Sequence, residues 1–208
     1  MKVFRKLLWS LVCIQGLALT LAQDAESVIR QALEAHLSVP HMRSVIEGNT
    51  TSSDPEMPAF LLGKSKVIQE FVAPDSFRMT MYDADGKLMS DTIILKTGSY
   101  DLNEAGVWEA GEPELHELSM MAREMSVKEL VIRNVQQLAD ESFEGVLCAV
   151  YSYESELRTI ISQNKVWIDK VTGLMVGMEG SSTLSPTLHT TSRATFDYTT
   201  PITITAPF

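Results

Sequence analysis

Short segments in which apolar and polar residues alternate occur throughout this chain, and they constrain its fold more than any other feature. In the clearest of them, Ser76–Tyr82 (SFRMTMY), Phe77, Met79 and Met81 point to one side of an extended chain. The Asp-Gly pair in the following Asp83–Gly86 favours a tight hairpin turn, because both central positions of such turns need a positive φ. The pattern predicts a meander of antiparallel strands.

Three segments have the spacing of amphipathic helices instead. Asp24–Leu37 is the first, and Pro40 stops it. Between the two groups of strands, the apolar stripes of Leu115–Met125 and Leu130–Leu138 predict two further short helices. The predicted order is one helix, about five strands, two helices and about five strands, the last at Ile202–Thr205. This order predicts an α+β fold, in which a curved antiparallel sheet carries its helices on one side.

The N-terminus has the pattern of a secretory signal. Lys2, Arg5 and Lys6 precede an apolar run that ends in small residues at Ala22. The run is shorter than the roughly 20 apolar residues that a membrane span needs. We therefore expect residues 1–22 to be a cleaved signal peptide and residues 23–208 to be a single secreted domain.

The charge of the chain excludes some classes of partner. Loss of three cations with residues 1–22 changes the formal net charge from −10 to −13. Nucleic acids and anionic lipid surfaces would repel such a domain. We expect partners that are apolar, neutral or basic.

Cysteine usage and motifs give no sign of redox chemistry or catalysis. Only Cys148 remains after cleavage, so the mature chain can form no intramolecular disulfide, and the apolar neighbours of this thiol predict a buried side chain. The sequence lacks a Gly-x-Ser-x-Gly elbow, a Cys-His pair and a glycine-rich phosphate loop. Asp83 and Asp85 begin like a calcium loop, but the remaining ligands are absent. We expect a protein that is not an enzyme and that uses no cofactor or metal.

Several short motifs together resemble the periplasmic LolA/LolB-like superfamily. They are Ala73–Arg78 (APDSFR), Gly145–Cys148, Val166–Asp169, Thr172–Leu174, Phe196–Tyr198 and Ile202–Pro207. The resemblance implies an unclosed β-barrel whose opening is covered by helices and whose cavity is apolar. It also implies a ligand such as a lipid or a lipoprotein acyl chain, or a role in envelope-stress regulation. In the dedicated lipoprotein carriers the resemblance implies a basic residue before Pro74, where this chain has Ala73.

Methionine is abundant in this chain, with eleven residues, and its flexible thioether suits surfaces that accept varied apolar shapes. Methionines also fill ordinary cores, so this composition does not require a cavity. If helix and sheet faces meet, the residues expected to line a cavity are Phe77, Met79, Met81, Leu118, Met121, Met125 and Trp167. The strand register, which the sequence leaves open, decides the face on which Trp167 lies.

The sequence favours two functions over a third, an enzyme that uses an unmarked pair of carboxylates, because it singles out no such pair. In the first, the domain holds a lipid, an acyl chain or another apolar ligand, with a role in lipid or lipoprotein trafficking. In the second, the sheet is packed solid and an acidic surface recognises a basic partner protein of the envelope.

Overall fold

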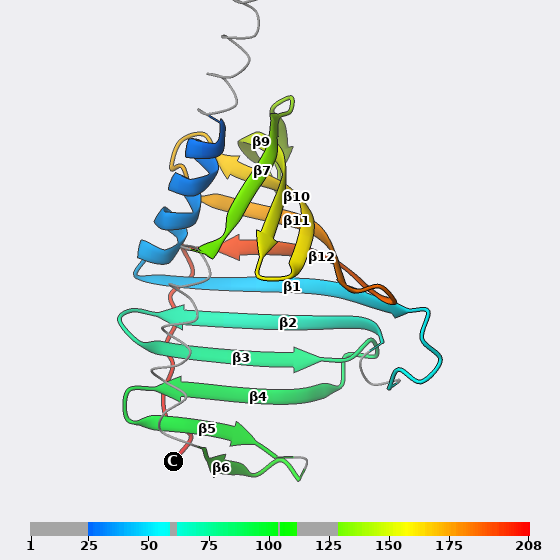
Figure 1. Ribbon diagram of the computed structural model, residues 1–208. Coiled ribbons are helices and arrows are strands. Elements are labelled where there is room, and N and C mark those ends of the chain that lie inside the picture. Colours follow the sequence, from blue (N-terminus) through cyan, green and yellow to red (C-terminus); the bar gives the residue numbers. More distant parts are fainter. Residues whose placement is uncertain (1–24, 59–61, 104, 112–128) are drawn as a thin grey trace, which may run out of the picture.

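The computed structural model describes residues 25–58, 62–103, 105–111 and 129–208. They form a helix over residues 25–38 and a single twelve-stranded sheet (Figure 1). The strands are β1 (His41–Ser52), β2 (Gly63–Val72), β3 (Ser76–Tyr82), β4 (Leu88–Leu95), β5 (Gly98–Leu102), β6 (Trp108–Ala110), β7 (Val131–Gln137), β8 (Glu141–Phe143), β9 (Val146–Leu157), β10 (Ile160–Asp169), β11 (Met175–Ser185) and β12 (Leu188–Asp197).

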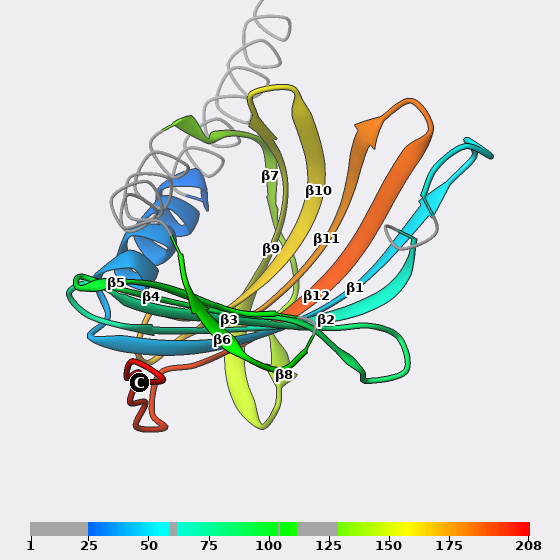
Figure 2. The ribbon, with the colours of Figure 1, turned by 90° about the horizontal axis from the view of Figure 1, so that it is seen from below.

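The sheet is antiparallel throughout, and its two edges do not meet. Its strand order is β6-β5-β4-β3-β2-β1-β12-β11-β10-β9-β7, and β8 pairs with β9 beside this path. The first and last strands of the order therefore stay unpaired on their outer sides among the described residues. Figure 2 shows the sheet curving around the helix, with the β8 hairpin on the other side. We call the side that the helix covers the concave face and the opposite side the outer face.

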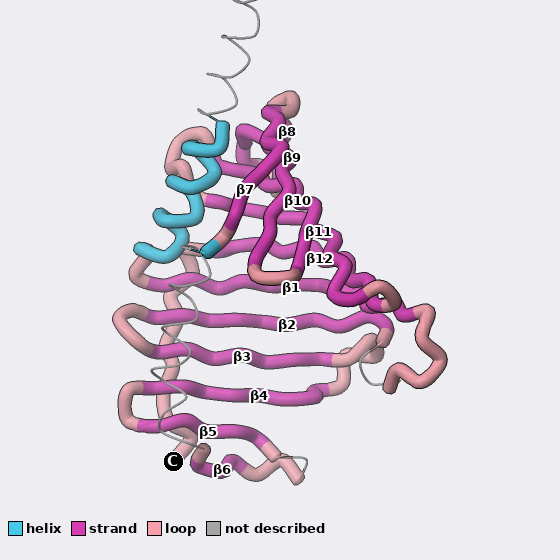
Figure 3. The backbone as a smooth tube through the Cα atoms, in the orientation of Figure 1, coloured by secondary structure: helices cyan, strands magenta, loops and turns pink. Residues whose placement is uncertain are grey.

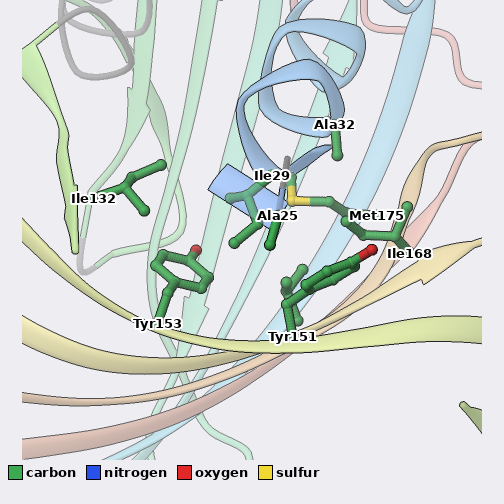
Figure 4. Close-up of a cluster of buried hydrophobic side chains, with 9 residues drawn as sticks. Ala25, Ile29, Ala32, Ile132, Tyr151, Tyr153, Ile168 and Met175 are labelled. Carbon is green, nitrogen blue, oxygen red and sulfur yellow. The ribbon is translucent and has the colours of Figure 1, made fainter. Parts of the chain in front are cut away.

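The helix is held on the concave face by the larger of two hydrophobic clusters (Figure 4). Ile29, fully buried, projects from the helix between Tyr151 and Tyr153 of β9. Burial raises the pKa of Tyr153 to about 12. The remaining buried members are Ala25, Ala32, Ile132, Val166, Ile168 and Met175. The helix thus packs on the part of the sheet formed by β7 and β9 to β12, and its expected position near residues 24–37 is confirmed.

The smaller cluster lies on the outer face, under the β8 hairpin. It contains Phe143, Cys148, Val150 and Trp167. The burial expected for Cys148 is confirmed, and removal from water raises the pKa of its thiol. Both faces of β9 and β10 are therefore covered.

The hairpin predicted at Asp83–Gly86 is present between β3 and β4. The Asp83 Oδ1 accepts hydrogen bonds from the N–H groups of Asp85 (3.0 Å) and Lys87 (2.9 Å), and Gly86 has a φ of 77°. The Asp83 carboxylate therefore stabilises the turn.

The second predicted mid-chain helix is wrong, because its residues form β7 (Figure 3). A bulge between Arg133 and Gln136, with Asn134 at a φ of 54°, puts Ile132 and Val135 on the same side of the strand. The residues that pack on the core are therefore three positions apart, which is the spacing of an amphipathic helix, although the segment is a strand. The first predicted mid-chain helix, Leu115–Met125, lies outside the described residues.

The predicted strand at Ile202–Thr205 is also wrong, since residues 201–208 form no strand. Because β12 lies between β1 and β11, a strand that directly follows it finds no free edge beside it. The chain instead runs past the strand ends to β5 (Figure 1), where the rings of Phe208 and Tyr100 are 5.4 Å apart.

The predicted signal peptide, residues 1–22, lies outside the described residues. Within the described part of the chain, no helix has the length and apolar character of a membrane span.

Candidate binding surfaces on the two faces of the sheet

An apolar surface on β2 to β4 continues the concave face beyond the helix. Met79, Gln69, Ser44 and Phe196 are successive register partners across β3, β2, β1 and β12. Register partners share a face of a sheet, and Phe196 packs against the helix cluster. Met79 therefore points to the concave side.

The neighbours of Met79 on this face are also apolar. Phe77 and Met81, two residues away on either side, share its side of β3. Phe77 is paired with Phe71 of β2 and Ile94 of β4, both buried, and Met81 is paired with Val67. None of these side chains belongs to either hydrophobic cluster of the described residues. We call this set, Val67, Phe71, Phe77, Met79, Met81 and Ile94, the apolar patch.

The structure thus brings together three of the seven residues predicted to line a cavity. Phe77, Met79 and Met81 are half-buried neighbours in the apolar patch. Leu118, Met121 and Met125 lie outside the described residues. Trp167 lies on the outer face, apart from the other three, because Val166 and Ile168 on either side of it face the helix.

Trp167 holds the β8 hairpin against the outer face. Its Nε1 donates to Glu141 Oε2 (2.9 Å), its ring lies 4.9 Å from that of Phe143, and the Lys165 Nζ lies 4.5 Å from its ring centroid. Lys165 also donates to both Glu141 oxygens, at 2.9 and 3.0 Å. The hydrogen bond from Lys165 and, to a smaller extent, that from Trp167 lower the pKa of the Glu141 carboxyl group. The tryptophan is therefore an anchor for the hairpin.

A groove of about 1140 Å³, lined mostly by charged, amide and hydroxyl side chains, crosses the outer face beside this hairpin. Its floor includes one row of register partners that runs Lys165, Glu179, Arg193, Glu47, Lys66 and Tyr82, from β10 across β11, β12, β1 and β2 to β3. We call it the charged row. A neighbouring row carries amide and hydroxyl side chains, among them Gln163, Thr191 and Asn49, and the β3–β4 turn closes one end.

The charges of this row are only partly paired within the chain. The Arg193 Nη1 donates to Glu179 Oε1 at 2.9 Å, and Lys165 is paired with Glu141. No ion pair joins Glu47 to Lys66 among the described residues, although they are register partners. All these side chains are open to water at the groove, so their pairs contribute little to stability.

Sequence reasoning missed this groove. Alternation shows that Lys165 shares a face with Trp167. The residues of the charged row, however, come from six strands and are separated by up to 146 positions in the chain, between Glu47 and Arg193. Their alignment depends on the register between strands, which alternation along single strands does not encode.

Comparison with known proteins identifies the fold. No family model matches the sequence, and no curated protein matches it either. Among solved structures, the lipoprotein LppX of Mycobacterium tuberculosis superimposes with a TM-score of 0.58 at 14% identity, over 88% of this chain and 99% of LppX. The fold is LolA/LolB-like.

Two further solved structures are more distant. A LolA superfamily protein of Nitrosomonas europaea has 9% identity, with a TM-score of 0.35 over 83% of this chain and 91% of that protein. MucB has 10% identity, with a TM-score of 0.46 over 87% of this chain and 61% of MucB. The strand order itself shows the unclosed, curved antiparallel sheet that was expected, and the described residues add one helix over residues 25–38.

Proposed function

We propose that this protein is a periplasmic binding protein that holds a lipid, an acyl chain or another apolar ligand on the concave face of its half-barrel. Its role would lie in lipid or lipoprotein trafficking, and it would act without covalent chemistry or a cofactor. The apolar patch carries this proposal, because it is an apolar surface on the concave face that belongs to neither cluster of the described core.

The energetics of apolar burial support the proposal. An alkyl chain gains about 0.8 kcal/mol for each methylene that leaves water. A chain of about twelve carbons would therefore gain on the order of 10 kcal/mol before the cost of ordering it. The methionines of the patch suit such a ligand, since an unbranched thioether adjusts to different chain shapes.

Native mass spectrometry of the protein purified from its own cell envelope tests this proposal. We expect a bound species with the mass of a lipid or fatty acid, released by organic solvent. A ligand-free protein that also fails to take up fluorescent fatty acids would overturn the proposal.

The second candidate is an interaction module whose acidic surface recognises a basic envelope protein. The formal net charge of −10 supports it. Crosslinking pull-downs at low and high salt separate the two candidates, because a partner held by exposed charges is lost as screening increases. A partner retained equally at both salt concentrations would count against this candidate.

A further inference from the structure

We propose that the groove on the outer face is a docking site for a helical segment of a partner protein, one that carries acidic and basic side chains on alternate turns. This inference does not rest on lipid binding, because the groove and the apolar patch occupy opposite faces. It also differs from recognition by an acidic surface, because the groove carries both signs of charge.

The shape of the groove favours an elongated ligand. The charged row crosses six adjacent strands, and neighbouring strands lie about 4.8 Å apart, so the row is about 24 Å long. Along β1, β10, β11 and β12 the groove takes in three residues each, such as Glu47–Asn49 and Glu179–Ser181, which is about 10 Å. It is wider only on β2, where it extends from Lys64 to Ile68. These dimensions are those of an α-helix of about 16 residues, which is about 10 Å in diameter.

The backbone hydrogen bonding of the strands under the groove favours a helical ligand over an extended peptide. The strands under the groove are paired on both sides, so their backbone N–H and C=O groups are used within the sheet. An extended peptide lying across them could add no strand, and its own backbone groups would face side chains. A helix satisfies its backbone internally and is recognised by its side chains alone.

The order of charges favours a partner of mixed charge. From Lys165 to Lys66 the charges of the row alternate in sign, one on each strand. The strand spacing of about 4.8 Å is close to the helical rise of about 5.4 Å per turn, so successive turns of a docked helix would meet successive strands. Complementary charges on those turns would fix the register of the helix in the groove.

The same charges argue against other ligands. Four basic and three acidic side chains line the groove, so its charge is too nearly balanced for a nucleic acid or a simple anion. The middle of the charged row, Glu179, Arg193 and Glu47, offers no apolar floor for an acyl chain. A polypeptide that carries both signs of charge fits the groove best.

Two designed helical peptides of equal composition test the inference. The first presents Glu, Lys, Glu, Lys and Glu on successive turns of one face, an order that is complementary to the row in either direction. The second presents the three Glu before the two Lys. Fluorescence anisotropy at low salt should show at least about tenfold tighter binding of the alternating peptide, and this preference should shrink in high salt. Equal binding of the two peptides would overturn the inference.

A charge reversal in the protein locates the site. Lys66→Glu should weaken binding of the alternating peptide about threefold to tenfold, and a peptide with Lys at the matching turn should recover the loss. Lys96→Glu, in the exposed turn between β4 and β5, is the matched control and should bind like the wild type. An unchanged affinity of Lys66→Glu, or a peptide displaced by inorganic phosphate at constant ionic strength, would contradict docking in the groove. Fatty-acid uptake should be unchanged in Lys66→Glu, so the failure of one proposal leaves the other testable.

Discussion

The ring of Phe143 occupies the space that a side chain on Gly177 would need. A Cβ atom placed on Gly177 would lie 2.7 Å from the Cε1 and Cε2 atoms of that ring, closer than carbon atoms approach in folded proteins. The β8 hairpin therefore rests directly on the backbone of β11. The Phe143 ring also lies 4.9 Å from the ring of Trp167 and 5.1 Å from the guanidinium carbon of Arg193. The absence of a side chain at position 177 is what lets the hairpin cover the outer face.

Gly177→Ala should destabilise the protein by about 1–3 kcal/mol, because the methyl group overpacks this contact. The free energy of unfolding in urea measures the effect. Gly48→Ala is the matched control, since its Cβ would meet only ordinary contacts, the nearest at 3.4 Å from Ser65 Oγ. Equal stability of the two variants would show that Phe143 does not sit on β11.

Ile29→Ala should cost about 2–5 kcal/mol of unfolding free energy, because Ile29 is fully buried where the helix packs on the sheet. Val171→Ala, at a position 92% exposed, should change it by less than about 0.5 kcal/mol. Thermal or urea unfolding distinguishes the two variants. A loss below about 1 kcal/mol for Ile29→Ala would mean that the helix is not packed on this cluster.

Tyr198→Phe should lower the free energy of unfolding by about 1–2 kcal/mol. The Tyr198 hydroxyl donates to the Met175 carbonyl oxygen (2.7 Å) and lies 2.9 Å from His36 Nδ1, so it joins the end of β12 to β11 and to the helix. Tyr82→Phe removes a hydroxyl that has no such hydrogen bond among the described residues, and it should be nearly neutral. Urea unfolding of both variants tests this difference.

The carboxyl group of Glu141 should make the stability of the folded protein depend on pH in the acidic range. Its pKa is lowered in the folded protein, so its stabilising effect is complete above the ordinary carboxyl pKa and is lost as the pH falls through the folded value. The melting temperature of the wild type should therefore fall more steeply with decreasing pH, from about pH 5 downward, than that of Glu141→Gln. Parallel curves for the two proteins would contradict the role of Glu141 in anchoring Lys165 and Trp167.

The sequence was sufficient for the features that depend on local pattern. Alternation located β3 correctly, and the Asp-Gly pair located the turn after it. Local pattern failed at β7, where a bulge imitates helical spacing, and at Ile202–Thr205, where pairing depends on which sheet edges are free. The face of Trp167 could not be derived either, because it depends on what covers each side of β10.

Of the two candidate surfaces, the apolar patch could be predicted in part from the sequence and the groove with its charged row could not. The apolar side of Phe77, Met79 and Met81 follows from one strand alone, so it was predictable. The charged row was not, because Lys66 and Arg193 become near neighbours only through the pairing of β1 with both β2 and β12.

Titration with a fluorescent fatty acid tests the proposed function most directly when Met79→Glu is compared with Met89→Glu. Met79 lies in the apolar patch, whereas Met89 is 47% exposed near the start of β4. We predict that the wild type and Met89→Glu bind the probe alike, and that Met79→Glu binds it at least about tenfold more weakly, because a charge on the concave face opposes an alkyl chain. Equal binding by all three proteins, or no binding by the wild type, would contradict the claim that the concave face holds an apolar ligand.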